Sequence, residues 1–310
     1  MLWIIFFHSA LHLSNDFFRI FRGIGYMGVD IFLFLSGIGI TYSLQQNSNI
    51  LSFYKKRLLR ILPSYIIIML IMGIICYFTG KANIEEIIIN FTMLGFWLQK
   101  SAHIVIATPW YIPAILFLYF ISPVFFYFFN RNKRLTLGIF IIIPLFLEYL
   151  VFDTHFEGLG TFFFMRIPIY FIGIYTGHLI LRNATLNIYQ IILLCISLPI
   201  GIFLYILKID YGYLPHNTFL KVLFLWLPCL FVSTSMSIIL SQIFQISRYK
   251  FPVLLFFGKY SLIIYLVHEK LLFILRGLDI QFSNILSVIL TCIIAYYLQN
   301  VLDNKFLKKI

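Results

Sequence analysis

The stretch from Thr108 to Phe129, TPWYIPAILFLYFISPVFFYFF, contains no charged residue and is long enough to cross a lipid bilayer as one helix. A transmembrane helix needs about 20 mainly apolar residues to pass through roughly 30 Å of hydrocarbon. Similar stretches recur along the chain, of which 62% is hydrophobic and only 11% is charged. Soluble domains carry about 25% charged residues. The composition therefore excludes a water-soluble protein and indicates an integral membrane protein.

We predict an all-α, polytopic fold with about ten transmembrane helices. The expected spans are approximately 1–13, 28–45, 62–79, 108–129, 135–152, 164–181, 187–207, 219–240, 253–272 and 284–301. Segment 84–98 is apolar but short, which favours an interfacial or re-entrant helix. The first span reaches only about 20 Å at 1.5 Å per residue, so we expect its helix to be truncated at the N-terminus. Residues 1–310 are expected to form one transmembrane domain.

The basic residues indicate how these spans are oriented. In a soluble protein a net charge of +12 would suggest nucleic-acid binding, but in a membrane protein Lys and Arg collect in cytoplasmic loops. We therefore expect no nucleic-acid partner. The densest clusters fall on one side, which holds Lys55, Lys56, Arg57, Arg60, Arg131, Lys133, Arg134, Arg182, Arg248, Lys250, Lys305, Lys308 and Lys309. With an even number of spans, both termini are then cytoplasmic.

His8 is a candidate functional residue because ionisable groups inside a membrane are costly and usually have a role. A neutral imidazole can accept and return a proton at physiological pH. The alternative is a structural histidine hydrogen-bonded to a neighbouring helix. His12 lies on the same helical face, but the pair has no third ligand and no HExxH pattern. We expect no metal site.

Asp30 begins the second span within GVDIFLFLSG, residues 28–37. Its carboxylate could orient or charge-stabilise a histidine, as an acid does in catalytic triads. The alternative is a carboxylate at a helix N-terminus, where the helix dipole favours negative charge. The residue type and its position leave both interpretations open.

The segment FYKKRLLRILP, residues 53–63, is strongly basic, and we expect it to be a cytoplasmic loop. It could anchor the protein to lipid head groups or bind an anionic cofactor. Arg57 and Arg60 are three residues apart and share one helical face, with Lys56 beside them. Guanidinium groups suit phosphate because they donate two parallel hydrogen bonds.

Four sequence blocks occur in a characteristic order. They are GVDIFLFLSG at 28–37, FYKKRLLRILPSY at 53–65, TPWYIPAILFLYFISPVF at 108–125 and FGKYSLIIYLVHEKLL at 257–272. With these blocks the chain resembles the membrane acyltransferase-3 family. Members of that family have about ten spans and acylate hydroxyl groups of sugars, chiefly in bacterial surface polysaccharides.

The resemblance implies roles for the residues that match the family motifs. The histidine of the family's first span matches His8, and the acidic residue of the family's second span matches Asp30. The RxxR pair that binds acyl-coenzyme A in the family matches Arg57 and Arg60. The Trp of the fourth span matches Trp110, and the late Tyr-Leu-x-His pattern matches Tyr265 and His268. Two positions depart from the pattern. The arginine of R-x10-H would lie eleven positions before His8, upstream of Met1. Ile115 stands where many relatives have glutamate, although branches that read WYxPAI share this difference.

The resemblance implies acyl transfer across the membrane to a hydroxyl of a surface glycan or of its lipid-linked precursor. Acetyl-coenzyme A is the expected donor, with its phosphates on Lys56, Arg57 and Arg60. His8 is expected to act as general base or transient acyl acceptor, and Asp30 to orient it. Trp110, Tyr111 and His268 are expected to contact the substrate.

Membrane lipid and the glycan acceptor are the expected partners, and a separate cell-envelope partner could complete the transfer. The expected location is the bacterial cytoplasmic membrane. One alternative is a transporter or flippase of polysaccharide precursors, which would favour repeated halves with broken spans. Another is an inactive relative that serves as a membrane scaffold, for which the absent arginine is the evidence.

Overall fold

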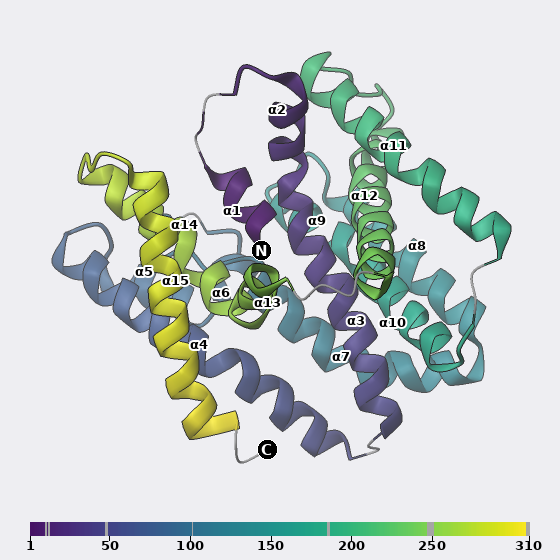
Figure 1. Ribbon diagram of the computed structural model, residues 1–310, viewed down its shortest axis with the longest axis horizontal. Coiled ribbons are helices and arrows are strands. Elements are labelled where there is room, and N and C mark those ends of the chain that lie inside the picture. Colours follow the sequence, from purple (N-terminus) through teal and green to yellow (C-terminus); the bar gives the residue numbers. More distant parts are fainter. Residues whose placement is uncertain are drawn as a thin grey trace. The chain divides into compact units, whose positions relative to one another are not determined.

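The computed structural model is entirely helical in the residues that it describes, which are 1–9, 11, 13–46, 49–100, 102–184, 187–246 and 251–307 (Figure 1). Eight helical runs in this part are long and apolar enough to cross a membrane. The bent pair Pro252–Lys259 and Ser261–Gly277 makes a ninth if it is one span. The all-helical, multi-span prediction is confirmed, with eight or nine candidate spans instead of about ten. His12, Arg248, Lys250, Lys308 and Lys309 lie outside the described residues.

The difference in number comes from the first expected span. Helix α1 covers Leu2–His8, and its 7 residues reach roughly 10 Å, which is too short to cross the hydrocarbon alone. Segment 84–98 contains two short helices, α5 (Ile84–Phe91) and α6 (Leu94–Trp97). A capping box between Asn83 and Glu86 begins α5 because each side chain binds the other's backbone N–H.

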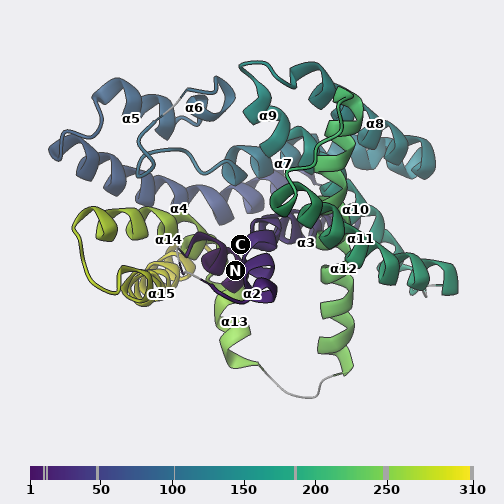
Figure 2. The same cartoon turned by 90° about the horizontal axis from the view of Figure 1, so that it is seen from above.

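The first of two compact units combines three separate segments, Met1–His12, Leu51–Leu116 and Lys250–Ile310. Besides α1, α5 and α6 it contains nearly all of α4 (Ile50–Phe78), the first turns of α7 (Tyr111–Arg131), α13 (Pro252–Lys259), α14 (Ser261–Gly277), α15 (Ser283–Leu302) and the short η3 (Asp303–Leu307). α14 packs along α15 and also contacts α1. α13 and α14 meet at 81° (Figure 2). The N-terminal helix α1 thus packs against α14, a helix from the C-terminal part of the chain, within this unit.

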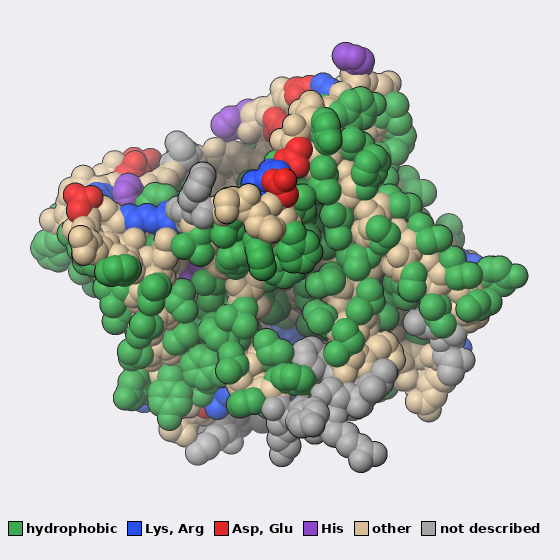
Figure 3. Space-filling view, turned by 45° about the horizontal axis from the view of Figure 1, so that its top comes forward, with side chains coloured by type: hydrophobic (Ala, Val, Ile, Leu, Met, Phe, Trp, Pro, Cys, Tyr) green, Lys and Arg blue, Asp and Glu red, His purple; other side chains and the backbone are tan. Residues whose placement is uncertain are grey.

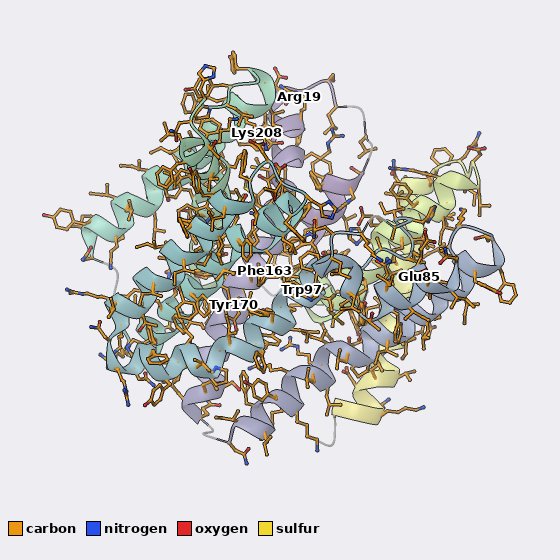
Figure 4. The ribbon with its side chains drawn as sticks, turned by 180° about the vertical axis from the view of Figure 1, so that it is seen from behind. Arg19, Glu85, Trp97, Phe163, Tyr170 and Lys208 are labelled. Carbon is orange, nitrogen blue, oxygen red and sulfur yellow. The ribbon has the colours of Figure 1, made fainter. Side chains whose placement is uncertain are left out.

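The second unit combines Leu13–Ile50 and Phe117–Tyr249. It contains α2 (Asp16–Gly23), η1 (Ile24–Met27), α3 (Gly28–Gln46), the rest of α7, α8 (Lys133–Val151), α9 (Glu157–Phe162), η2 (Phe164–Arg166), α10 (Ile167–Leu181), α11 (Ile188–Asp210) and α12 (Thr218–Ile246). The Arg19 guanidinium lies 2.6 Å from Asp210 Oδ1 and joins α2 to the end of α11, where Figure 4 also labels Lys208.

Small residues allow α3 and α10 to pack backbone against backbone. A Cβ at Gly37 would lie 2.2 Å from the Tyr170 carbonyl oxygen, and a Cβ at Gly173 would lie 2.2 Å from that of Phe34. The close approach also lets Thr41 Oγ1 donate to the Ile174 carbonyl at 2.9 Å. Contacts of this kind are typical of helices that associate in lipid.

Hydrophobic side chains cover most of the face shown in Figure 3. The exposure of apolar side chains is greatest for α8 and α11, where only 17% of the most apolar stretch of 18 residues is buried inside the protein. Such exposure would favour aggregation in water but is expected where lipid is the solvent. The outer surface therefore agrees with a multi-pass membrane protein.

Candidate active site

His8, the last residue of α1, contacts α14 in the first unit. Its Nδ1 lies 3.3 Å from Glu269 Oε1, and both side chains are partly exposed, by 26% and 39%. The His8 ring also meets the His268 ring edge-on, with centroids 5.1 Å apart and planes at 73°. Because α1 ends at His8, the histidine is presented at a helix terminus, where one side of the ring remains accessible.

His268 has one ring nitrogen bound and the other without a partner. Its Nδ1 lies 2.9 Å from the Ile264 carbonyl oxygen and 3.1 Å from that of Tyr265. Carbonyl oxygens only accept hydrogen bonds, so Nδ1 carries the proton and Nε2 of the neutral ring has a lone pair. His268 is 4% exposed, and its Nε2 has no hydrogen-bond partner among the described residues. A buried acceptor of this kind is available to a hydroxyl or amide donor.

Lys270 connects α14 to the segment before α7. Its buried ammonium donates to the carbonyl oxygens of Val105 and Ala107, both at 2.8 Å, and more weakly to that of Ile104 at 3.4 Å. These three bonds use the full donor capacity of an ammonium group. The segment that leads to Trp110 and Tyr111 is therefore held by the same helix that carries His268 and Glu269.

Asn90 at the end of α5 holds the next residues of that segment. Thr108 Oγ1 donates to the Asn90 carbonyl at 2.6 Å, and Thr108 N–H lies 3.3 Å from Asn90 Oδ1. Tyr65 of α4 donates to the same carbonyl at 2.9 Å. The short helices of 84–98 thus support the loop that enters α7.

A row of aromatic rings runs from this loop to the histidines. Trp110 meets Tyr111 with centroids 6.3 Å apart, and Tyr111 meets Tyr265 at 5.5 Å. Tyr265 in turn lies 6.2 Å from the His268 ring. The tertiary structure therefore connects Trp110 and Tyr111 through Tyr265 to His268, and His268 contacts His8.

The basic residues Lys56, Arg57 and Arg60 lie on α4, not in a loop. Lys56 and Arg60 are exposed, and Arg57 is half-buried with its guanidinium 5.7 Å from the Phe53 ring. α4 has 29 residues, which span roughly 43 Å and exceed the hydrocarbon thickness by two or more turns. This excess length allows the basic turns to lie outside the hydrocarbon while the rest of α4 crosses it.

Asp30 lies on α3 in the second unit, where its carboxylate is paired with an arginine. Its Oδ2 is 3.1 Å from Nη1 of Arg166, and the two side chains are 1% and 4% exposed. The same guanidinium lies over the Tyr26 ring at 5.8 Å. Each charge compensates the other, which is required when both are removed from water.

A comparison with known protein families gave a match for this chain. The model of the acyltransferase-3 family, described as an acyltransferase domain, matches residues 1–298. The chain belongs to the acyltransferase-3 family. No curated protein and no solved structure gave a match. The matched residues of this acyltransferase contain His8, Asp30, the basic turns of α4 and the whole of α14.

Two residues of the candidate site, Glu269 and Lys270, were not singled out from the sequence pattern of this acyltransferase. A signal was present, because an acid and a base side by side within an apolar helix require polar partners. The pattern could not name those partners, since His8 and the 104–107 carbonyls are distant in the chain. Ile115, which stands where many relatives carry glutamate, is completely buried. The carboxylate that contacts His8 is that of Glu269 on α14.

His8 has one ring nitrogen at a carboxylate and a partly exposed ring, which is the geometry of a group that can accept and release a proton. Among the described residues, no group of three His, Cys, Asp or Glu side chains is placed so that it could hold a metal ion.

Proposed function

We propose that this acyltransferase transfers an acyl group, with acetyl from acetyl-coenzyme A as the expected donor, to a hydroxyl of a surface glycan or lipid-linked glycan precursor. The reaction would cross the bacterial cytoplasmic membrane, with both chain termini on the cytoplasmic side. The observation that carries the proposal is the position of His8: it lies within the matched family residues, contacts a carboxylate and stands beside a second histidine.

The chemistry requires a group that moves one proton. Nε2 of His8 takes the proton from the acceptor hydroxyl while the oxygen attacks the thioester carbonyl. The carbon–sulfur bond then breaks, and the coenzyme A thiolate takes the proton from His8 as it leaves. Atoms and charge balance without a metal or redox partner, and the histidine returns to its neutral form.

The remaining site residues suit the two substrates. Lys56, Arg57 and Arg60 would bind the phosphates of coenzyme A, because charge-assisted hydrogen bonds to phosphate are among the strongest in proteins. Trp110 and Tyr111 present aromatic faces on which a sugar can stack, and the Nε2 of His268 can accept from a hydroxyl. Lipid and a separate cell-envelope protein are the further partners that we propose.

A transporter of glycan precursors and a membrane scaffold are the two alternative functions. A transporter would need no thioester donor, although it could use a proton-transfer group, and a scaffold would need neither. The match to an acyltransferase family favours acyl transfer over transport, and the contact between His8 and Glu269 argues against a scaffold. Turnover of acetyl-coenzyme A by the purified protein separates the acyltransferase function from both alternatives.

The first prediction concerns His8→Ala. The purified full-length protein in lipid nanodiscs is expected to hydrolyse acetyl-coenzyme A slowly and, in cells, to place acetyl esters on the surface glycan. Both activities should fall by about 100-fold or more in the variant, because general acid–base catalysis contributes roughly 10²–10⁴ in rate. Thiol release and ester content measure the two effects.

His155→Ala is the matched control, since that histidine lies in an exposed loop of the second unit. It should keep both activities at equal expression. Activity that survives intact in His8→Ala would contradict the mechanism, and a wild-type protein without any thiol release would contradict the function.

A further inference from the structure

Two consecutive residues of α14, His268 and Glu269, both contact His8. Adjacent positions of an α-helix point about 100° apart, so His268 and Glu269 can approach one ring from two directions. His268 meets it edge-on and Glu269 meets its Nδ1. The His8 side chain is therefore restrained both in rotation and in the placement of its proton.

Each of the two neighbours is itself held in place. His268 is fixed through Nδ1 by carbonyls of its own helix. Glu269 is followed by Lys270, whose three bonds to Ile104, Val105 and Ala107 attach this part of α14 to the neighbouring segment. A carboxylate on a helix anchored in this way can hold a partner more exactly than one on a free loop.

The carboxylate of Glu269 contacts one particular nitrogen of the His8 ring, Nδ1. An ionised carboxylate accepts hydrogen bonds but donates none, so Nδ1 of His8 must carry a proton to bind it. Nε2 of the neutral ring then has the lone pair. Protonation of Nε2 makes an imidazolium that faces the negative charge of Glu269, which stabilises this form during the reaction.

We propose that Glu269 is the positioning residue of His8: it selects the tautomer in which Nε2 exchanges the proton with substrate. The sequence pattern favoured Asp30 for this role, but the carboxylate of Asp30 is paired with Arg166, whereas that of Glu269 contacts His8. The kinetic part of the proposal rests on the acyl-transfer function, and the tautomer part does not.

The test compares Glu269→Gln, His8→Ala and the double variant in the full-length protein. Gln keeps the shape of the side chain but loses its charge and offers both a donor and an acceptor. The expected result is a fall in kcat of roughly 10-fold or more, by analogy with loss of the acid in a triad, with little change in KM for acetyl-coenzyme A. The double variant should be no slower than His8→Ala, because a residue that acts through His8 has no further effect once His8 is removed.

Nitrogen-15 NMR of histidine-labelled protein gives a readout without turnover. The His8 signals are assigned by their loss in His8→Ala. Wild type is expected to show the form with the proton on Nδ1, and Glu269→Gln is expected to shift the population towards the other tautomer. Glu85→Gln is the control, because Glu85 is an exposed acid at the start of α5 in the same unit (Figure 4). It should change neither the spectrum nor kcat.

The outcomes separate this proposal from the proposed function. An unchanged His8 tautomer in Glu269→Gln would overturn the positioning role, even if acyl transfer is observed. A double variant much slower than His8→Ala would also overturn it, since Glu269 would then act independently. If the wild type shows no acyl transfer but the tautomer shifts as expected, the positioning role stands and the function fails.

Discussion

Lys270 shows how a charge is retained inside an apolar helix. Its side chain is 3% exposed, yet its ammonium has no need of water because three backbone carbonyls surround it. The same bonds satisfy carbonyls of the 104–107 segment, which lies outside regular helix. Irregular backbone at membrane depth is tolerated when protein groups satisfy it. One residue therefore stabilises both the helix that carries the histidines and the loop that enters α7.

Lys270→Met is predicted to lower stability. The substitution keeps the length of the side chain but leaves three buried carbonyl oxygens without a donor, and breaking a buried charged network costs about 3–5 kcal/mol. Thermal unfolding of the purified protein should show a clear fall in Tm. Lys81→Met, at an exposed lysine of the same unit, should leave Tm nearly unchanged. Equal Tm values for the two variants would show that the carbonyl contacts contribute little.

At the scale of elements, the α3–α10 contact depends on two glycines that face each other's helix. The positions of Gly37 and Gly173 leave no room for a Cβ because a main-chain atom stands at 2.2 Å in each case. Backbone atoms cannot turn aside as flexible side chains do. α3 also carries Asp30, and α10 follows Arg166 directly. The packing of α3 against α10 therefore brings the two charged groups of the buried ion pair close together.

Gly37→Val is predicted to destabilise the second unit, whereas Gly39→Val should not. Both positions lie on α3, but a Cβ at Gly39 would meet no atom of the described residues within 4 Å beyond its own helix backbone and chain neighbours. Overpacking typically costs about 1–3 kcal/mol, and the cost at Gly37 should reach or exceed that range because α10 must move. Yield after membrane extraction and Tm measure the effect. If both variants lose the same stability, valine in the helix and not the helix contact is responsible.

At the scale of the whole molecule, binding of a donor should be visible as a change in global stability. A ligand that binds only the folded state stabilises it by about 2.7 kcal/mol at 100 times its Kd. The proposed phosphate-binding residues Lys56, Arg57 and Arg60 lie on α4, a helix of 29 residues. Stabilisation of this helix should therefore be shared by the unit that contains the histidines.

Acetyl-coenzyme A is predicted to raise the Tm of the wild-type protein, and Arg57→Ala with Arg60→Ala should remove most of this increase. Loss of charge-assisted hydrogen bonds worth about 1.5–3 kcal/mol each corresponds to at least a tenfold weaker Kd. Lys133→Ala with Arg134→Ala removes the same charge from the start of α8 and should keep the ligand effect. An equal loss in both double variants would indicate general charge attraction, and no effect of the ligand on wild type would argue against the donor site.

The sequence by itself was sufficient for the class of fold and for the family. Long apolar stretches indicate directly that the chain lies in lipid, because every unpaired polar group in hydrocarbon is costly. The blocks around Asp30, Arg57 and Trp110 indicated the acyltransferase-3 family, which the match over residues 1–298 confirms. His8 was found for the same reason, as an ionisable side chain within an apolar run. The end of α1 at His8 and the bend between α13 and α14 were not predicted. Hydropathy measures the composition of a segment and does not show where a helix ends or bends.

The partners of these residues were decided only by the tertiary structure. A carboxylate near His8 could be expected from the need to balance charge, but nothing in the local pattern distinguishes Asp30 from Glu269. The first pairs with Arg166 and the second contacts His8 because of which helices pack together. Pair interactions between distant segments depend on distances of a few ångströms, whereas apolar length and residue type are local properties. The sequence therefore determined the membrane fold and the candidate histidine, and the packing of α14 against α1 decided what that histidine contacts.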